Sequence, residues 1–237
     1  MRVPAPRDCI ELAGTDWDAA RSEMVARQIR SRGIRSEKVL AAMSAVPRHL
    51  FVSPEQAFDA YSDTPLPIGE GQTISQPYIV AAVSEALALN GEETVLEIGA
   101  GCGYQAAVLS LLSCQVTSIE SHPALASAAR ERLHRLGFGN VQVIEGDGSA
   151  GWLARAPYSA IVVSAAAPRV PAPLLDQLAP GGSLVIPVGD LETQELRQIV
   201  RTPRGFESEL ICNCRFVPLT GLFGWGGKFS SQESAGK

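Results

Sequence analysis

The segment VLEIGAGCGY, residues 95–104, constrains the fold more strongly than any other part of this sequence. Its first part, VLEI, has the apolar character expected of a short buried strand, and the residues after the glycines have the pattern of a helix. Gly99, Gly101 and Gly103 let the backbone turn tightly and approach a ligand closely. A strand that passes through a glycine loop into a helix predicts a nucleotide-like ligand at the carboxyl ends of parallel strands.

Strands and helices alternate after this segment, and the alternation decides the predicted fold class. Further strands are predicted at residues 116–119, 141–144, 160–163 and 183–188, and helices at 121–137 and 173–178. This order predicts an α/β fold with a doubly wound, mostly parallel sheet. Residues 195–200 and 208–219 flank the turn segment TPRGF and predict an antiparallel hairpin at the edge of the sheet.

The residues before the sheet follow a different pattern and predict a helical lobe. Helices are expected from Asp16 onward, at 36–45 and at 78–89, whereas the Pro- and Gly-rich residues 60–77 are expected to form a loop. The predicted organisation is a flexible arm at residues 1–15, an N-terminal helical lobe with its loop at 16–90, a ligand-binding domain at 91–225 and a disordered tail at 226–237.

Composition and charge exclude several classes of protein. A formal net charge of −5 does not favour binding to nucleic acid or to an anionic membrane surface. The chain lacks the run of about 18 apolar residues that a membrane span needs, and its first 15 residues lack the apolar core of a secretory signal. The five cysteines have no framework spacing and the three histidines are scattered, which favours a cytoplasmic protein with reduced thiols and no metal centre.

The glycine loop also distinguishes between two classes of cofactor. Dinucleotide-binding loops follow the pattern G-x-G-x-x-G, in which the third glycine allows close packing of helix and strand. Here Tyr104 occupies the place of that glycine and Gly103 precedes it, so the pattern is G-x-G-x-G. Glu97, two residues before the loop, would sit poorly beside a pyrophosphate but suits the amino group or sulfonium of S-adenosylmethionine. Both features favour S-adenosylmethionine over a dinucleotide.

Two acidic residues at later strand ends are candidates to contact the same ligand. Glu120 ends the second strand, where a carboxylate can accept hydrogen bonds from both ribose hydroxyls. Alternatively, Glu120 stabilises the dipole of the next helix. Asp147 and Gly148 follow the third strand, where the aspartate either binds an adenine amino group or forms an Asx-turn. For both acids, the contact with a ligand is the favoured role.

The polar segment GQTISQP, residues 71–77, lies between a Pro-rich turn and a predicted helix. Thr73 and Ser75 place two hydroxyls there, although one cap is enough for a helix. Either Ser75 caps the helix or the segment holds a ligand, and the two roles do not exclude each other.

These features, taken together with others along residues 17–225, resemble the protein-L-isoaspartate (D-aspartate) O-methyltransferase family. The matching segments are VPRHLFV, AYSDTPLPIGEGQTISQP, VLEIGAGCGYQAAVL, EGDGSAGW, SAAAPRVPAPLLDQLAPGG, LVIPVG and RFVPLTG. GQTISQP is far more specific than the glycine loop. The resemblance implies a Rossmann-like class I methyltransferase fold, with an N-terminal helical lobe that carries a substrate loop, an S-adenosylmethionine-binding domain and an antiparallel C-terminal edge.

The resemblance also implies a reaction and its participants. A methyl group would pass from S-adenosylmethionine to the free carboxylate of L-isoaspartyl residues in damaged proteins or peptides, with acceptance of D-aspartyl residues left open. The methyl ester then closes to a succinimide, and hydrolysis of the ring restores some normal aspartate. A monomer is expected, with neither nucleic acid nor membrane as a partner.

The same resemblance implies roles for individual residues. Ser75 is expected to contact the substrate carboxylate, while Gln72 and Thr73 line the cofactor side of their loop. Thr220, in RFVPLTG, matches a family position near the cofactor. The other expected cofactor-binding residues are Glu97, Gly99, Gly101, Gly103, Glu120, Asp147 and Gly148.

Three residues depart from the family's usual pattern, and three alternative functions remain. Cys102, Ser159 and Ser164 stand where Ser or Thr, Asp, and Thr are usual, and none is expected to affect the site. The nearest alternative is a related carboxyl methyltransferase that acts on an aspartate of a dedicated biosynthetic peptide. The others are a non-catalytic cofactor-binding regulator and a dinucleotide oxidoreductase. The unaltered GQTISQP segment and Tyr104 favour isoaspartyl methylation.

Overall fold

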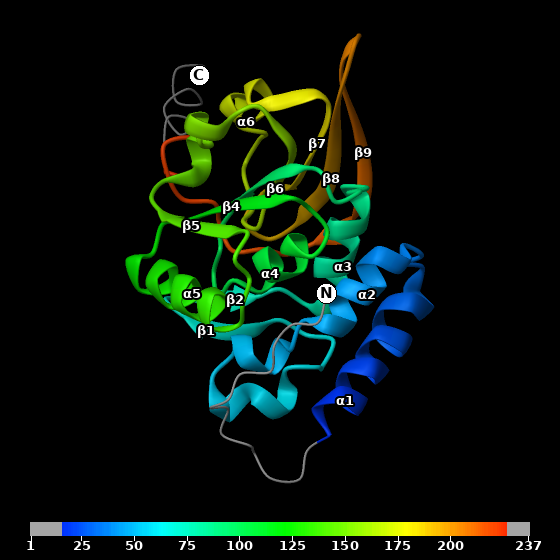
Figure 1. The fold of residues 1–237 in the computed structure, drawn as a ribbon. Coiled ribbons are helices and arrows are strands. Elements are labelled where there is room, and N and C mark those ends of the chain that lie inside the picture. Colours follow the sequence, from blue (N-terminus) through cyan, green and yellow to red (C-terminus); the bar gives the residue numbers. More distant parts are fainter. Residues whose placement is uncertain (1–15, 227–237) are drawn as a thin grey trace.

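A seven-stranded sheet forms the centre of the molecule (Figure 1). The computed structural model describes residues 16–226, so the predicted arm at residues 1–15 and the tail from residue 227 onward lie outside the described range. The strands are β3 (Thr94–Ile98), β4 (Gln115–Glu120), β5 (Val141–Glu145), β6 (Tyr158–Val163), β7 (Leu178–Gly189), β8 (Gln194–Thr202) and β9 (Gly205–Cys214). Their spatial order is β5-β4-β3-β6-β7-β8-β9.

The sheet is parallel from β5 to β7 and antiparallel at β8 and β9, which confirms the predicted fold class and the edge hairpin. The chain leaves β3 toward β4 and β5, then returns and places β6 on the other side of β3. Such a reversal leaves a crevice at the carboxyl ends of the central strands. The glycine loop after β3 therefore lies where α/β proteins bind ligands.

Helices and buried side chains cover both faces of the sheet. The helices that follow the hairpin and the strands are α3 (Pro77–Ala86), α4 (Tyr104–Ser110), α5 (Pro123–Arg135) and α6 (Ala172–Asp176). Val95 belongs to a core shared with α3, α4 and α5, whereas its neighbour Leu96 belongs to a second core with α6. Successive strand residues alternate between the cores because their side chains point to opposite faces. Burial on both faces explains why the strands are continuous apolar runs in the sequence.

The N-terminal segment is helical, as predicted, and its buried side chains join the first core. α1 (Trp17–Glu23) continues through a π-helical run, Met24–Ile29, and a 3₁₀ turn, Arg30–Arg32. α2 (Glu37–Ala45) begins after Ser36, whose hydroxyl caps the helix by accepting a hydrogen bond from the Val39 amide. Further 3₁₀ helices lie at Arg48–Phe51, Pro54–Asp59, Gly148–Ala150 and Leu153–Arg155. None of the helices within residues 16–226 is long and apolar enough to cross a membrane.

The expectation of a plain loop at residues 60–77 is wrong, because part of it forms an antiparallel hairpin. β1 (Leu66–Gly69) pairs with β2 (Gln72–Ile74). Their turn contains Gly69, Glu70 and Gly71, which have φ values of +93°, +52° and +68°. Such a left-handed turn is accessible mainly because two of its three residues are glycines. The hairpin carries the GQTISQP segment to the carboxyl edge of the main sheet (Figure 1).

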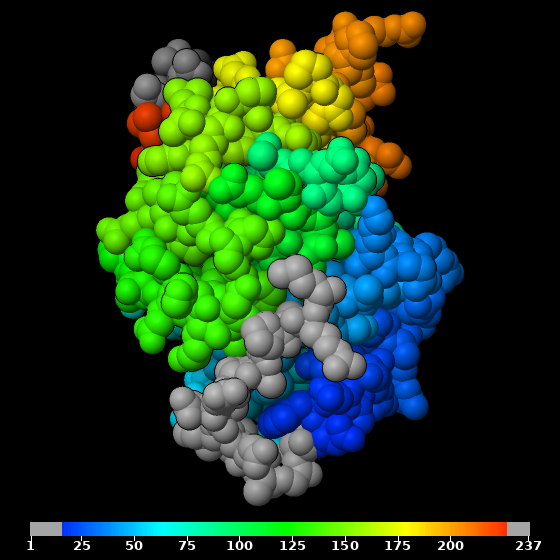
Figure 2. All heavy atoms as spheres, in the orientation of Figure 1, coloured from blue at the N-terminus to red at the C-terminus, as the bar shows by residue number. Residues whose placement is uncertain are grey.

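After the β8–β9 hairpin, the last described residues run back toward the centre of the sheet. The β8–β9 hairpin projects from the body of the molecule (Figure 2). After β9, Pro218 pairs with Ala166 beyond the end of β6, and the amide of Leu219 donates a hydrogen bond to the Ala166 carbonyl at 2.7 Å. This return places residues 217–220 beside the glycine loop.

Candidate active site

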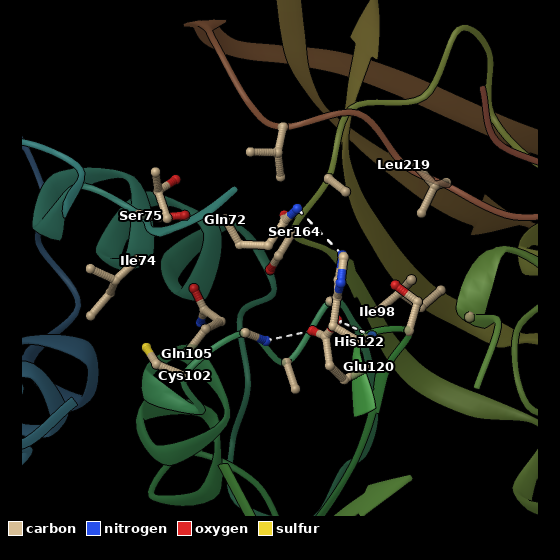
Figure 3. A pocket seen from close by; sticks show the side chains of 18 of the residues that line it. Gln72, Ile74, Ser75, Ile98, Cys102, Gln105, Glu120, His122, Ser164 and Leu219 are labelled. Carbon is tan, nitrogen blue, oxygen red and sulfur yellow. Dashed lines mark hydrogen bonds between the residues drawn. The ribbon is translucent and has the colours of Figure 1, made fainter. Parts of the chain in front are cut away.

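A cavity opens at the carboxyl ends of β3 and β4, at the crevice that the strand order predicts (Figure 3). Segments far apart in the sequence surround it: the β1–β2 hairpin, the glycine loop, the end of β4, residues 148 and 164–165 after β5 and β6, and the return segment at 217–220. Of the predicted site residues, the structure brings together Gln72, Thr73, Ser75, Gly99, Gly101, Glu120, Gly148 and Thr220. Most of the predicted site residues therefore lie around one cavity in the folded chain.

Glu120 holds the glycine loop in its shape. One carboxylate oxygen accepts a hydrogen bond from the Gly101 amide at 2.7 Å, and the other accepts one from the His122 amide at 2.9 Å (Figure 3). Gly99 and Gly101 have φ values of +90° and +53°, so the loop follows a path that favours glycine. Glu120 is only 4% exposed, and each of its oxygens has a second lone pair. The carboxylate can therefore accept two more hydrogen bonds from a ligand.

Ser75 does not cap the helix that follows it. The residue before α3 is Gln76, whose side chain makes no capping hydrogen bond, and Pro77 occupies the first helical position. Proline has no amide hydrogen and fits the first turn of a helix, so this helix start has one donor fewer to satisfy. The Ser75 side chain instead lies at the cavity (Figure 3). Of the two roles considered for Ser75, the structure favours contact with a ligand.

A second cavity adjoins the first and shares four of its lining residues. Thr73, Ser75, Ser164 and Val217 line both cavities. The second cavity extends toward residues 213–217, between the end of β9 and the start of α3. Ser75 thus stands at the junction of two spaces, one beside the glycine loop and one beside the end of the sheet. This arrangement can hold two ligands with their reacting ends in contact.

Ser164 and His122 are site residues that sequence reasoning missed. Ser164 was expected to leave the site unaffected, but it lines both cavities. His122 is one of the three scattered histidines, none of which the sequence assigned to the site. Its Nε2 instead lies 3.5 Å from Gln72 Nε2, so the Gln72 amide reaches across to the β4–α5 connection (Figure 3). The available signal was position, since both residues follow the ends of parallel strands.

Three predicted cofactor residues do not line the cavity: Glu97, Gly103 and Asp147. Gly103 serves helix packing, because a Cβ at this position would lie 3.1 Å from Leu133 Cδ1 in α5. Asp147 forms the Asx-turn considered as its alternative role, with Oδ1 accepting a hydrogen bond from the Ser149 amide at 2.8 Å. Its Oδ2 accepts one from the Leu222 amide, also at 2.8 Å, and so attaches the return segment to β5. Burial raises the pKa of Asp147, but these hydrogen bonds more than offset it and hold the pKa below its usual range.

Glu97 is buried in the core beneath the loop. It is 0% exposed, and its Oε2 accepts a hydrogen bond from the Ser118 hydroxyl on β4. Its Oε1 has no hydrogen-bond partner within residues 16–226. Burial raises the pKa of Glu97 to about 8; the Ser118 hydrogen bond opposes this rise and the nearby Glu120 charge adds to it. Burial therefore favours the protonated form of Glu97, which lies in the core and does not line the cavity.

Glu97→Gln is expected to stabilise the protein increasingly as the pH rises. Below the ordinary glutamate pKa of about 4.3, native and unfolded chains both bind the proton. Between that pH and about 8 only the native chain binds the proton. The free energy of unfolding of the wild type therefore falls by up to about 1.4 kcal/mol per pH unit over this range. The glutamine side chain does not titrate, so the free energy of unfolding of the variant does not fall in this way. The variant should melt at least about 5 °C above wild type at pH 8.5 and close to it at pH 5.

Thermal unfolding at pH 5, 7 and 8.5 measures this difference. Glu145→Gln is the control, because Glu145 is an exposed carboxylate at the end of β5 and should show no such trend. A difference between Glu97→Gln and wild type that stays constant over this pH range would show that Glu97 is already ionised in the native protein.

The cavity fits a ligand that combines a flat apolar group, vicinal hydroxyls and a polar tail. Ile98, Ile119 and Leu219 provide apolar walls, and Gly148 packs tightly against this wall, because a Cβ there would lie 2.7 Å from Ile98 Cγ2. Glu120 provides the free acceptor capacity for hydroxyls. The polar side chains of Gln72, Thr73 and Gln105 also line the cavity. An adenosine with a polar substituent has parts that match these three kinds of lining.

Comparison with known proteins finds one family whose members resemble this chain over most of its length. The family model described as Protein-L-isoaspartate(D-aspartate) O-methyltransferase matches residues 19–223. A protein-L-isoaspartate O-methyltransferase of Methanoculleus marisnigri is 53% identical over 210 residues, covering 89% of this chain and 96% of the relative. One from Pelobacter propionicus, numbered 2, is 51% identical and covers 95% of this chain and 100% of the relative.

Solved structures agree with this comparison. A protein-L-isoaspartate O-methyltransferase structure superposes with a TM-score of 0.77 at 28% identity, covering 86% of this chain and 67% of that one. A putative protein-L-isoaspartate O-methyltransferase of Plasmodium falciparum, solved in complex with S-adenosyl-L-homocysteine, gives a TM-score of 0.73 at 24% identity. It covers 84% of this chain and 98% of that one, and it supports the fold. Both agree with the class I methyltransferase fold predicted from the sequence.

Proposed function

Because the chain belongs to the protein-L-isoaspartate (D-aspartate) O-methyltransferase family, we infer that it methylates the free carboxylate of L-isoaspartyl residues in damaged proteins. It is an S-adenosylmethionine-dependent enzyme, and the methylation initiates repair. The observation that carries the assignment of roles is the position of Ser75, whose side chain lines both the cavity beside the glycine loop and the one beside the end of the sheet. We propose that the first is the cofactor cavity and the second is the acceptor cavity.

The reaction needs alignment more than it needs acid–base chemistry. S-adenosylmethionine supplies an electrophilic methyl group on its sulfonium. The acceptor carboxylate has a pKa of about 4, so it is already an ionised nucleophile at pH 7 and no general base is required. Orientation alone can provide effective molarities of about 10⁵ M or more. We propose that Ser75 orients the acceptor by donating a hydrogen bond to the carboxylate oxygen that does not react.

Other residues of the site are proposed to position the donor and exclude water. Glu120 accepts hydrogen bonds from the ribose hydroxyls. It also fixes the shape of the glycine loop by accepting hydrogen bonds from the Gly101 and His122 amides. Gln72 reaches His122 across the mouth of the cofactor cavity and thereby limits the entry of water (Figure 3). Thr73, Ser164 and Thr220 add polar contacts around the reacting ends. A dry site strengthens the attraction between the carboxylate and a cationic donor.

The product accounts for repair without a further enzyme step. The nitrogen of the neighbouring backbone amide attacks the carbonyl carbon of the methyl ester, and the succinimide ring closes as methanol leaves with the amide proton. Hydrolysis of the ring returns some normal aspartyl linkages, and the isoaspartyl product re-enters the cycle. Acceptance of D-aspartyl residues by the same pocket remains a proposal to be tested with the matching peptide.

The first test of this function is a methyl-transfer assay with labelled S-adenosylmethionine. Two peptides are compared that differ in one residue, L-isoaspartate or normal L-aspartate. Transfer to the isoaspartyl peptide alone is expected. Transfer to neither peptide, with cofactor binding intact, would contradict the repair function and favour the alternative, an enzyme that methylates an aspartate of one dedicated biosynthetic peptide.

We propose that the enzyme acts as a monomer in the cytoplasm, without nucleic acid or membrane as a partner. The formal net charge of −5 supports the absence of an anionic partner. Within residues 16–226, Cys102, Cys114, Cys212 and Cys214 are free thiols, which suits a reducing compartment. We also propose that residues 16–90 form a helical lobe with a substrate loop and that residues 91–225 form a cofactor-binding domain.

A further inference from the structure

The acceptor cavity has one permanent charge on its wall. Among the described residues that line it, Arg215 is the only arginine, and there is no lysine, aspartate or glutamate. The other lining residues are apolar or neutral polar, including Thr73, Ser75 and Asn213. Arg215 is exposed, so it lies at the rim and not beneath the reacting groups. The mouth of this cavity therefore carries a net positive charge.

No acidic side chain neutralises this arginine. Within residues 16–226, Arg215 forms no ion pair and no hydrogen bond. Two acids on adjoining elements are paired with other arginines. Glu195, which faces Asn213 across the β8–β9 ladder, is paired with Arg197 at 2.8 Å. Asp63, next to the β1–β2 hairpin, is paired with Arg32 at 2.7 Å.

A free cation at this place has an electrostatic consequence for the substrate. The chain as a whole carries a formal charge of −5, which repels an anionic peptide. A rim arginine offsets that repulsion where the peptide must enter. Methyl transfer removes the charge of the acceptor carboxylate, so a cation in direct contact with that carboxylate would stabilise the bound substrate more than the transition state. A cation at the rim avoids this penalty if it acts on a charge next to the isoaspartate.

We propose that Arg215 is a specificity-determining residue, which makes the enzyme prefer isoaspartyl peptides that carry an acidic side chain next to the isoaspartate. The proposal rests on the proposed function and extends it to the sequence context of the substrate. The acidic neighbour would form an exposed ion pair with the guanidinium. Such pairs are weak and are screened by salt, so the preference is modest and depends on ionic strength.

The test compares two isoaspartyl peptides that differ only in the residue after the isoaspartate, glutamate or glutamine. The measured quantity is the ratio of their kcat/KM values at low ionic strength. Wild type should favour the glutamate peptide by about two- to fivefold, the range given by exposed ion pairs. In Arg215→Gln the ratio should fall to near one, and in Arg215→Glu it should fall below one. Arg215→Lys should retain most of the preference.

The matched control is Arg204→Gln, because Arg204 is an exposed arginine in the turn of the β8–β9 hairpin and lines neither cavity. It should leave the ratio unchanged. The wild-type preference should also decrease as salt is added beyond about 0.1 M, where the Debye length is about 10 Å. A ratio that is the same in Arg215→Gln and wild type would overturn the role of Arg215 while leaving the proposed function intact. Failure of wild type to methylate either peptide would instead overturn the proposed function itself.

Discussion

Replacing Glu120 with alanine is expected to weaken the binding of S-adenosylmethionine by a factor of about 10² to 10⁴. The carboxylate is proposed to accept two ribose hydroxyls, and hydrogen bonds to a charged group contribute about 1.5–3 kcal/mol each. Glu120 also accepts hydrogen bonds from the backbone amides of Gly101 and His122. Without it, these two backbone donors lose their partners and the glycine loop loses the contact that fixes its path. Isothermal titration with the cofactor measures the loss directly.

Two further variants separate cofactor contact from loop support. Glu120→Gln keeps one oxygen acceptor in the same place and should give an intermediate loss of affinity. Glu145→Ala removes the carboxylate that faces Glu120 in the β4–β5 ladder, but it is exposed and lies outside the cavity, so affinity should not change. Unchanged affinity in Glu120→Ala would remove Glu120 from the cofactor site and leave it with the structural role alone.

Replacing Ser75 with alanine is expected to lower kcat by about 10²-fold while cofactor affinity stays within about twofold of wild type. The proposed hydrogen bond orients a reactive carboxylate, and small errors in such alignment can cost about 10²-fold in rate. The cofactor is held mainly by the glycine loop and Glu120, which this substitution does not touch. Steady-state kinetics with an isoaspartyl peptide and titration with the cofactor together give both quantities.

The same variant tests whether Ser75 supports the helix instead. Loss of a helix cap destabilises a protein by about 0.5–2 kcal/mol, but Ser75 does not cap α3, so the free energy of unfolding should change little. Ser62→Ala is the control, because Ser62 is an exposed serine ahead of the same hairpin and lines neither cavity. Equal losses of turnover and of cofactor affinity would rule out the proposed role of Ser75 in orienting the acceptor.

The strands of the central sheet were predictable because their apolar runs reflect burial on both faces. Val95 and Leu96 are consecutive apolar residues, and each is buried in a different core. The β1–β2 hairpin was not predictable in the same way. Its strands have four and three residues, and they lie in a stretch so rich in proline and glycine that local rules favour a loop. Pairing between the two strands, and the left-handed turn at Glu70, decide the structure there.

The candidate site shows the same division between local and tertiary information. Glu97 and Glu120 both come from the carboxyl halves of parallel strands, and the sequence gives no reason to separate them. In the structure Glu97 lies opposite Ser118 within the β3–β4 ladder, where its side chain enters the core. Glu120 is the last residue of β4, beyond the ladder with β3, and its carboxylate turns to the glycine loop. Ser118 and Glu120 are two residues apart and share a face of β4, so the difference is that Glu120 lies past the end of the β3–β4 ladder, where it meets the glycine loop.

The sequence alone determined the α/β class, the position of the glycine loop, the family resemblance and the choice of Ser75, because each depends on patterns of neighbouring residues. Only the tertiary structure decided that Ser75 lines two cavities, that Ser164 and His122 also line the cavity beside the glycine loop, and that Glu97 and Asp147 do not line it. The physical reason is that local patterns fix which backbone conformation and which faces are favoured. The direction of each polar side chain depends on partners that the fold brings from distant parts of the chain.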